Sequence, residues 1–181
     1  MTGVRISTWG GNDEQLDRAS DLYARTFAEA PYDEDAEASR ASFTERIRRY
    51  AASKPHFRLL LASEGADAAG LALGTGIAAG DWWRDRVAPL LDEDTRDRWL
   101  GVSCFSVMEL AVDRRHRRSG VASALMEALL ADLPYSTAVL SRHADADSAG
   151  RFYAAQGWRE IATDVRIGDS PSLCVLARDL R

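Results

Sequence analysis

The chain has 181 residues, of which 46% are hydrophobic and 28% are charged, and its formal net charge is -5. This length and composition predict one globular domain over residues 1–181, with a sizeable apolar core. The acidic balance argues against general nucleic-acid binding, which needs a strongly basic face. Cys104 and Cys174 are too few for a disulfide framework, so we expect buried free thiols.

Neither the N-terminal residues nor the longest apolar segment indicates a membrane protein. The N-terminal residues have no apolar segment of the kind found in signal peptides. The longest apolar stretch, residues 68–80, is too short and too rich in glycine to span a bilayer. We therefore expect a cytoplasmic protein that does not associate with membranes.

Hydrophobic periodicity and turn residues predict alternating strands and helices along the whole chain. The segment from residue 104 to residue 143 is a strand–helix–strand crossover, so part of the sheet should be parallel. We expect the helix at 147–156 to be capped by Asp147 and stopped by Gly157. In chain order, the predicted elements are a strand at 4–9, helices at 13–30 and 36–53, a hairpin of 56–63 with 69–78, a helical insertion at 81–101 interrupted near Pro89, a strand at 104–112, a helix at 119–132, a strand at 137–143, a helix at 147–156, and a closing strand pair at 158–163 and 172–180.

The densest positive cluster of this acidic chain, residues 114–118, lies between a predicted strand and a predicted helix. The first N–H groups of a helix have no intrahelical partners, and the helix dipole adds positive charge there. Gly120 lets a ligand approach the backbone, while Arg117 and Arg118 can add charge-assisted hydrogen bonds. This pattern predicts a diphosphate on the amides of about 118–123, and a solvated basic turn is the alternative. The spacing matches neither G-x-x-x-x-G-K-[ST] nor G-x-G-x-x-G, which excludes those nucleotide sites.

Two motifs resemble the GNAT N-acetyltransferase superfamily. Its signature, [R/Q]-x-x-G-x-[G/A], is present as Arg117-Arg118-Ser119-Gly120-Val121-Ala122. Residues 149–158, AGRFYAAQGW, resemble the family's A-x-x-x-Y-x-x-x-G-[F/W] helix and turn. The resemblance is specific over about residues 104–160 and agrees in element order over the whole chain. It implies an α/β fold with a mixed, mostly antiparallel central sheet, a central βαβ crossover and flanking helices.

The resemblance implies acetyl-CoA as co-substrate and direct acetyl transfer to an amine. The pantetheine arm would run beside Leu110, Ala111 and Val112, between splayed fourth and fifth strands, and a strand amide would polarise the thioester carbonyl. Two positions depart from the family: Arg114 replaces the usual proline, and Ala146 replaces a frequent asparagine that contacts the cofactor. The residues expected to hold the diphosphate are Arg117, Arg118, Ser119, Gly120, Val121, Ala122 and Ser123.

Two residues are candidates for the proton transfers that acetylation requires. Tyr153 falls on the family position that faces the sulfur, which implies a general acid; a core tyrosine is the alternative. Glu109 matches a glutamate of many relatives that acts as base, directly or through water, and a purely structural glutamate is the alternative. Burial would raise the pKa of Glu109, which suits a base. His143 is a weaker base candidate. No Cys, His and carboxylate cluster has metal-ligand spacing, so we expect no metal.

The acceptor pocket of this fold is built from the connection of the first two helices and from insertions near the sheet. The acidic run around Asp33 favours a small cationic amine through electrostatic steering, unless it is a solvated loop. Trp82 and Trp83, with Tyr32, could form aromatic walls of this pocket. Alternatively, the two tryptophans belong to the core or to a dimer contact. The candidate substrate-binding residues are Tyr32, Asp33, Glu34, Trp82, Trp83 and Ser141.

The sequence leaves alternatives to a small-molecule N-acetyltransferase. One is an acetyltransferase that acts on a protein or peptide amine, and another is a non-catalytic module that senses acyl-CoA. A nucleic-acid partner is disfavoured by the acidic net charge. A homodimer, formed through the final strands or the Trp-rich insertion, is open.

Overall fold

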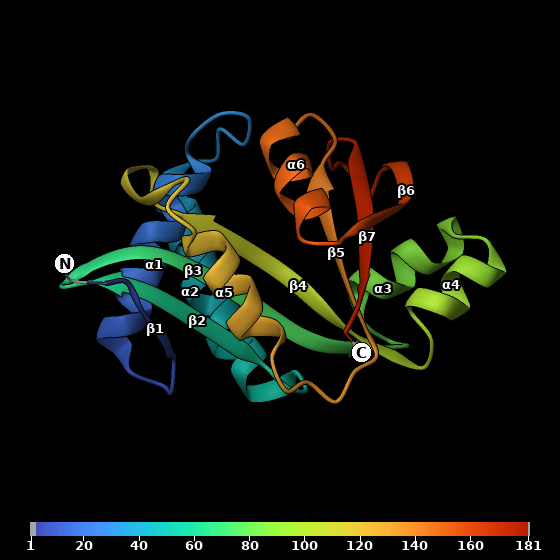
Figure 1. Cartoon of the computed structure of the whole chain (residues 1–181), viewed down its shortest axis with the longest axis horizontal. Coiled ribbons are helices and arrows are strands. Elements are labelled where there is room, and N and C mark those ends of the chain that lie inside the picture. Colours follow the sequence, from blue (N-terminus) through green and yellow to red (C-terminus); the bar gives the residue numbers. More distant parts are fainter. Residues whose placement is uncertain (1–2, 181) are drawn as a thin grey trace. The chain divides into compact units, whose positions relative to one another are not determined.

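The computed structural model describes residues 3–180 of the chain. Its helices and strands follow the order expected from the hydrophobic periodicity (Figure 1). The strands in this range are β1 (Arg5–Thr8), β2 (Arg58–Glu64), β3 (Asp67–Ala78), β4 (Ser103–Val112), β5 (Thr137–His143), β6 (Arg159–Val165) and β7 (Leu173–Asp179). The helices are α1 (Asp13–Phe27), α2 (Ala36–Ser53), α3 (Trp82–Val87), α4 (Glu93–Trp99), α5 (Val121–Leu130) and α6 (Asp147–Ala155), with short 3-10 turns η1 (Ala88–Leu90) and η2 (Arg114–His116).

The strands form one mixed sheet in the order β1-β2-β3-β4-β5-β7-β6. The pairs β1–β2, β2–β3, β5–β7 and β6–β7 are antiparallel. β4 and β5 are parallel, with Phe105 opposite Ala138 and Ser106 opposite Val139. The predicted mixed, mostly antiparallel sheet with a βαβ crossover is therefore confirmed.

The chain divides into two compact units, and β3 and β4 run through both of them. The first unit comprises Met1–Gly74 and Glu109–Ala131. In it, α1 packs on α2 and α5 packs on β2. Both α1 and α2 begin at side-chain caps, since Asn12 accepts a hydrogen bond from the Gln15 amide and Asp35 accepts one from the Ala38 amide. The largest fully buried side chains of this unit are those of Leu16, Leu22, Phe43, Ile47, Leu59, Leu61, Leu71, Leu73, Leu125 and Met126.

The second unit comprises Thr75–Met108 and Asp132–Arg181. The helical insertion is interrupted where expected, because Pro89 lies in η1 between α3 and α4. Both cysteines are buried free thiols, as predicted. Burial raises the pKa of the Cys104 thiol to about 12, so it is not a thiolate nucleophile at neutral pH. The core of this unit consists of Ile77, Val87, Leu91, Trp99, Leu100, Cys104, Val139, Val165, Ile167, Leu173, Val175 and Ala177.

The helix predicted at 119–132 is shorter at each end, Val121–Leu130, and two further predictions about helix ends are wrong. The first helix ends at Phe27 and not near Ala30, because the Glu29 amide bonds to the Thr26 carbonyl and starts a turn. Asp147 is not the cap of α6: the cap position is Ala146, which makes no side-chain hydrogen bond. Asp147 is instead the first residue of α6, where its negative charge complements the helix dipole.

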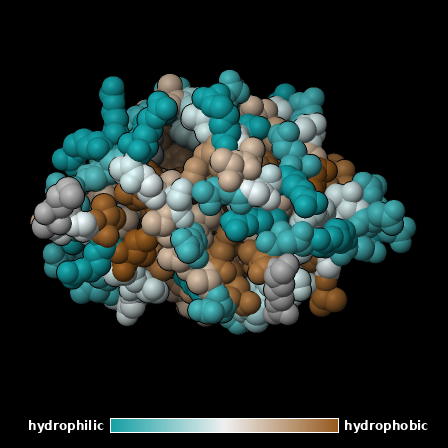
Figure 2. Space-filling view, in the orientation of Figure 1, coloured by the Kyte–Doolittle hydropathy of each residue, from teal (hydrophilic) through white to brown (hydrophobic). Residues whose placement is uncertain are grey.

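Hydrophilic side chains cover much of the face shown in Figure 2, with apolar side chains between them. The exposed large apolar residues are Val4, Trp82, Leu90 and Val102. Within residues 3–180, every helix is too short or too polar to cross a bilayer.

Gly70 lets α5 lie close to β3. A Cβ atom at this position would lie 2.9 Å from Leu125 Cδ1 and 3.0 Å from both the Ala111 carbonyl oxygen and Val121 Cγ1. We expect Gly70→Ala to lower the free energy of unfolding by about 1–3 kcal/mol, as overpacked cores do. Denaturant unfolding measures this, with Gly10→Ala as control because a Cβ there has no neighbour within 4 Å. An equal effect of both variants would contradict the close packing.

Candidate active site

The start of α5 carries no side-chain cap. Gly120 is the N-cap residue with φ +85°, and a Cβ atom there would have no neighbour within 4 Å. The Ser119 hydroxyl donates to the His116 carbonyl within the preceding loop and does not cap the helix. The amides at the start of α5 can therefore receive the oxygen atoms of an anionic ligand.

Carboxylates neutralise much of the positive cluster before this helix. The ion pairs are Arg115 with Asp113 at 3.1 Å and with Asp67 at 3.6 Å, and Arg117 with Glu29 at 2.8 Å. His116 Nε2 also lies 3.0 Å from a Glu64 carboxylate oxygen. Arg117 also donates to the Val112 carbonyl at 3.2 Å. Among residues 3–180, no ion pair or hydrogen bond engages the side chains of Arg114 and Arg118, both of which are exposed. Arg118, with φ +62°, is thus the uncommitted positive charge beside Gly120.

Asp113, the residue after β4, organises this loop. It is buried and accepts hydrogen bonds from Arg25 Nε at 2.9 Å, from the Arg115 amide at 3.0 Å and from Arg115 Nε at 3.1 Å. Its own amide donates to the Ala69 carbonyl at 2.9 Å. Burial alone would raise the pKa of Asp113, but the hydrogen bonds from Arg115 and Arg25 outweigh it and lower the pKa to about 2.

We expect Asp113→Asn to lower the free energy of unfolding at pH 7 by about 1.5–3 kcal/mol, because the amide is uncharged and offers one acceptor oxygen where the carboxylate offers two. The pKa of Asp113 is lower in the folded protein than in the unfolded chain, where it is about 3.9. Its contribution is therefore present above pH 4 and is lost as the pH falls toward 2. Denaturant unfolding of both proteins at pH 7 and at low pH measures this. Asp67→Asn, which removes an exposed partner of Arg115, is the control and should change stability by less than about 0.5 kcal/mol.

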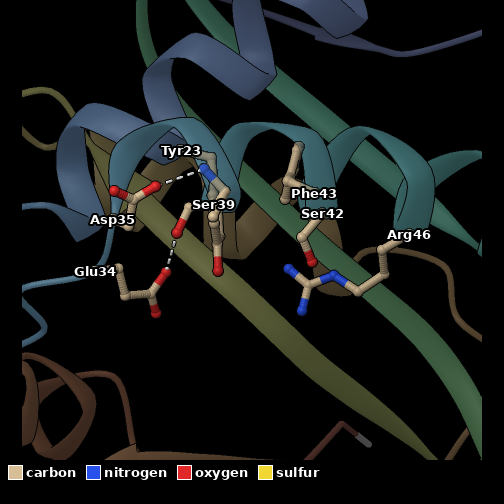
Figure 3. Close-up of a pocket in the computed structure, with 8 residues that line it drawn as sticks. Tyr23, Glu34, Asp35, Ser39, Ser42, Phe43 and Arg46 are labelled. Carbon is tan, nitrogen blue, oxygen red and sulfur yellow. Dashed lines mark hydrogen bonds between the residues drawn. The ribbon is translucent and has the colours of Figure 1, made fainter.

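A cavity of about 320 Å³ lies between the end of α1 and the start of α2. Tyr23 and Phe43 stack in its wall with ring centroids 4.4 Å apart. Figure 3 shows Arg46 extending along α2 toward the N-terminal end of the helix. The cavity is lined by Tyr23, Glu34, Asp35, Ala38, Ser39, Ser42, Phe43 and Arg46.

Arg46 joins this cavity to Glu109 on β4. Arg46 Nη2 lies 2.7 Å from Glu109 Oε1, and the two side chains are only 25% and 13% exposed. The guanidinium carbon also lies 5.6 Å from the ring centroids of Tyr23 and Phe43. Burial raises the pKa of Glu109, Arg46 opposes this rise, and Glu34 adds to it. Glu109 is therefore a partly desolvated carboxylate with one fixed cationic partner.

The acidic run between α1 and α2 is only partly a solvated loop. The Glu34 carboxylate accepts a hydrogen bond from the Ser39 hydroxyl at 2.6 Å, and Asp35 caps α2. Tyr32 packs edge-to-face on Phe27 with ring centroids 4.9 Å apart. Of the three candidate residues in this run, Glu34 lines the cavity, whereas Tyr32 and Asp33 are outside its lining in the described chain.

The remaining candidates belong to the second unit. Tyr153 lies on α6, and its ring packs edge-to-face on Trp158 at 6.0 Å between centroids. Trp83 Nε1 donates to the Ser141 hydroxyl at 3.3 Å, so these two candidates are brought together. Trp82 is 60% exposed and carries the Arg86 guanidinium 4.3 Å from its ring centroid. In residues 3–180, no group of three His, Cys, Asp or Glu side chains gathers in a way that could hold a metal ion.

Arg25, Arg46 and Asp113 belong to the candidate site, and the sequence patterns did not reveal them. Asp113 had one local signal, since it is a carboxylate placed directly between a buried strand and an arginine run. Nothing in the sequence of α2 distinguishes Arg46 from its neighbours Arg48 and Arg49.

Comparison with known proteins gives one family. A family model described as Acetyltransferase (GNAT) domain matches residues 61–160, and no curated protein is a significant match. A GNAT-family protein from Desulfovibrio desulfuricans is 14% identical over 99% of this chain and 100% of its own, with a TM-score of 0.68. The ribosomal-protein-S18-alanine N-acetyltransferase from Escherichia coli is 15% identical over 98% of this chain and 94% of its own, with a TM-score of 0.62. The yncA protein from Salmonella typhimurium, solved with its cofactor acetyl-CoA, is 14% identical over 99% and 95%, with a TM-score of 0.62. At these identities the structures show a shared fold.

Proposed function

Because the chain belongs to the GNAT acetyltransferase family, we propose that it transfers the acetyl group of acetyl-CoA directly to a primary amine. The observation that supports the proposal most directly is the start of α5 after Gly120, which no side chain caps and which lies within the family signature. The first backbone N–H groups of α5, with the guanidinium of Arg118, unpaired within residues 3–180, beside them, can bind a diphosphate. The structure of yncA with acetyl-CoA supports the same co-substrate.

In this proposal the signature loop holds the diphosphate and the end of β4 holds the pantetheine arm. Arg118 supplies the uncommitted positive charge, whereas Arg117 already binds Glu29 and the Val112 carbonyl. The proposed contacts to acetyl-CoA are made by Leu110, Ala111, Val112, Arg117, Arg118, Ser119, Gly120, Val121, Ala122 and Ser123.

The proposed proton transfers use a carboxylate and a phenol. Glu109 accepts the proton that the acceptor ammonium must lose, directly or through water. The freed nitrogen lone pair forms a bond to the acetyl carbon, and the carbon–sulfur bond breaks with its electron pair on sulfur. Tyr153 gives a proton to that sulfur, and the second proton, which the nitrogen loses as the amide forms, restores the phenol; the first proton leaves Glu109 for solvent. The raised pKa of the largely buried Glu109 supports its assignment as base.

We propose a small cationic molecule as the acceptor. The carboxylates of Glu34 and Asp35 and the stacked rings of Tyr23 and Phe43 in one cavity support this choice, because they offer negative charge beside an apolar surface. The second candidate is the amine of a protein, which is the substrate named for the similar Escherichia coli enzyme. The substrate-binding residues proposed from the sequence are Tyr32, Asp33, Glu34, Trp82, Trp83 and Ser141.

Release of the CoA thiol from acetyl-CoA tests both parts of the proposal. Polyamines and aminoglycosides are compared with peptides that carry a free N-terminus, and samples without amine give the background. We expect the highest kcat/KM with small cationic amines, and a preference for neutral or acidic peptides would contradict the acceptor class. Acetyl-CoA binding without turnover of any amine would favour a non-catalytic acyl-CoA sensor.

A further inference from the structure

We propose that Arg46 is a positioning residue for acetyl transfer: through its ion pair it holds the Glu109 carboxylate in place and stabilises its charged form. This inference rests on the proposed function, in which Glu109 is the base.

The guanidinium of Arg46 contacts one carboxylate and two aromatic rings. Nη2 lies 2.7 Å from Glu109 Oε1, and the guanidinium carbon lies 5.6 Å from the centroids of both the Tyr23 and the Phe43 ring. These rings stack on each other, so they form one aromatic platform built from α1 and α2. An exposed ion pair is loosely held and contributes little, but this pair is largely removed from solvent. The carboxylate is therefore held by a cation that cannot readily move away.

Among residues 3–180, the groups that interact electrostatically with the Glu109 carboxylate include Arg46 from α2, Glu34 from the α1–α2 connection and Tyr23 from α1. Burial and the charge of Glu34 both raise the pKa of Glu109, and Arg46 lowers it. Without Arg46 the protonated form would extend to higher pH. A protonated carboxyl cannot accept a proton from the ammonium, so Arg46 sets the pH above which the base works.

The kinetic test is the pH dependence of kcat/KM in Arg46→Met, Arg46→Lys and Arg49→Met. Removing an opposite charge at this distance should move the acid-limb midpoint up by about 1–3 pH units in Arg46→Met. Arg46→Lys should restore most of the wild-type profile. Arg49→Met is the matched control, because Arg49 is exposed on the same helix, stacks on Tyr50 and makes no contact with Glu109. Glu34→Gln should move the midpoint in the opposite direction, to lower pH, because it removes a negative charge.

A second measurement does not depend on turnover. The side-chain carboxyl of Glu109 is titrated by ¹³C NMR in the same variants, and its signal is assigned by its loss in Glu109→Gln. We expect the pKa of this carboxyl to rise in Arg46→Met and to return toward the wild-type value in Arg46→Lys. Thermal melting and acetyl-CoA binding check that each variant is folded; if Arg46→Met does not fold, Glu34→Gln still tests the sign of the charge effect.

The two measurements separate failure of this inference from failure of the proposed function. If the carboxyl pKa and the rate profile of Arg46→Met both match those of Arg49→Met while Glu109→Gln is inactive, Glu109 remains the base and the role of Arg46 is overturned. If the carboxyl pKa moves but the rate profile does not, the base is another group, which overturns both the assignment of Glu109 and this inference.

Discussion

Gly120→Glu is expected to raise the dissociation constant of acetyl-CoA at least about 100-fold, which corresponds to about 2.7 kcal/mol. The glycine is the N-cap of α5, and its missing side chain leaves the first helical amides open. A glutamate there places a carboxylate where the diphosphate is proposed to bind, and like charges at such a contact cost several kcal/mol. Calorimetric titration of acetyl-CoA into both proteins measures the effect.

Gly168→Glu is the matched control for this variant. Gly168 has φ +60°, and a Cβ atom there, as at Gly120, would have no neighbour within 4 Å, so the substitution brings the same charge and comparable backbone strain. It lies in the turn between β6 and β7, away from the signature loop in the sequence. If Gly120→Glu binds acetyl-CoA with the wild-type affinity, the diphosphate does not bind at this loop. If both variants lose affinity for acetyl-CoA equally, the loss is a general effect of charge or strain.

Local sequence signals explain why most of the fold could be predicted. The helix at 36–53 and the strand at 137–143 were predicted with the bounds that the structure shows, because a capping residue precedes the helix and the strand contains three consecutive apolar residues. The errors are at helix ends, and two of them have an identifiable cause. At Ala30 a backbone turn replaced the last helical residues, and at Asp147 the chain placed the carboxylate one position inside the helix. Both depend on the conformation of one or two residues, which hydrophobic periodicity does not determine.

The candidate site was predictable only where it is built from one continuous segment. The proposed diphosphate loop, 117–123, is such a segment, and its motif is visible in the sequence. The pairs that orient the site join distant residues: Arg46 and Glu109 are 63 positions apart, and Arg25 and Asp113 are 88 apart. An arginine in a helix has no local pattern that identifies its partner. For the same reason the pairing of Glu29 with Arg117 could not be separated from a solvated acidic run.

Glu109→Gln is expected to lower kcat about 10²- to 10⁴-fold while acetyl-CoA binding stays near the wild-type value. Glutamine has the same shape and can still accept a hydrogen bond from Arg46, but it cannot take the proton from the ammonium. Steady-state kinetics across pH, together with calorimetric binding, measures both quantities.

Glu45→Gln is the control, because Glu45 is exposed on α2 and the variant should retain full activity. A purely structural glutamate would behave differently: the variant would lose thermal stability through the unpaired Arg46 charge but would keep its acid-limb midpoint. A fall in kcat together with loss of the acid limb of the pH–rate profile therefore identifies Glu109 as the base. Wild-type kinetics with a lowered melting temperature would show that the Arg46–Glu109 pair is only a structural contact.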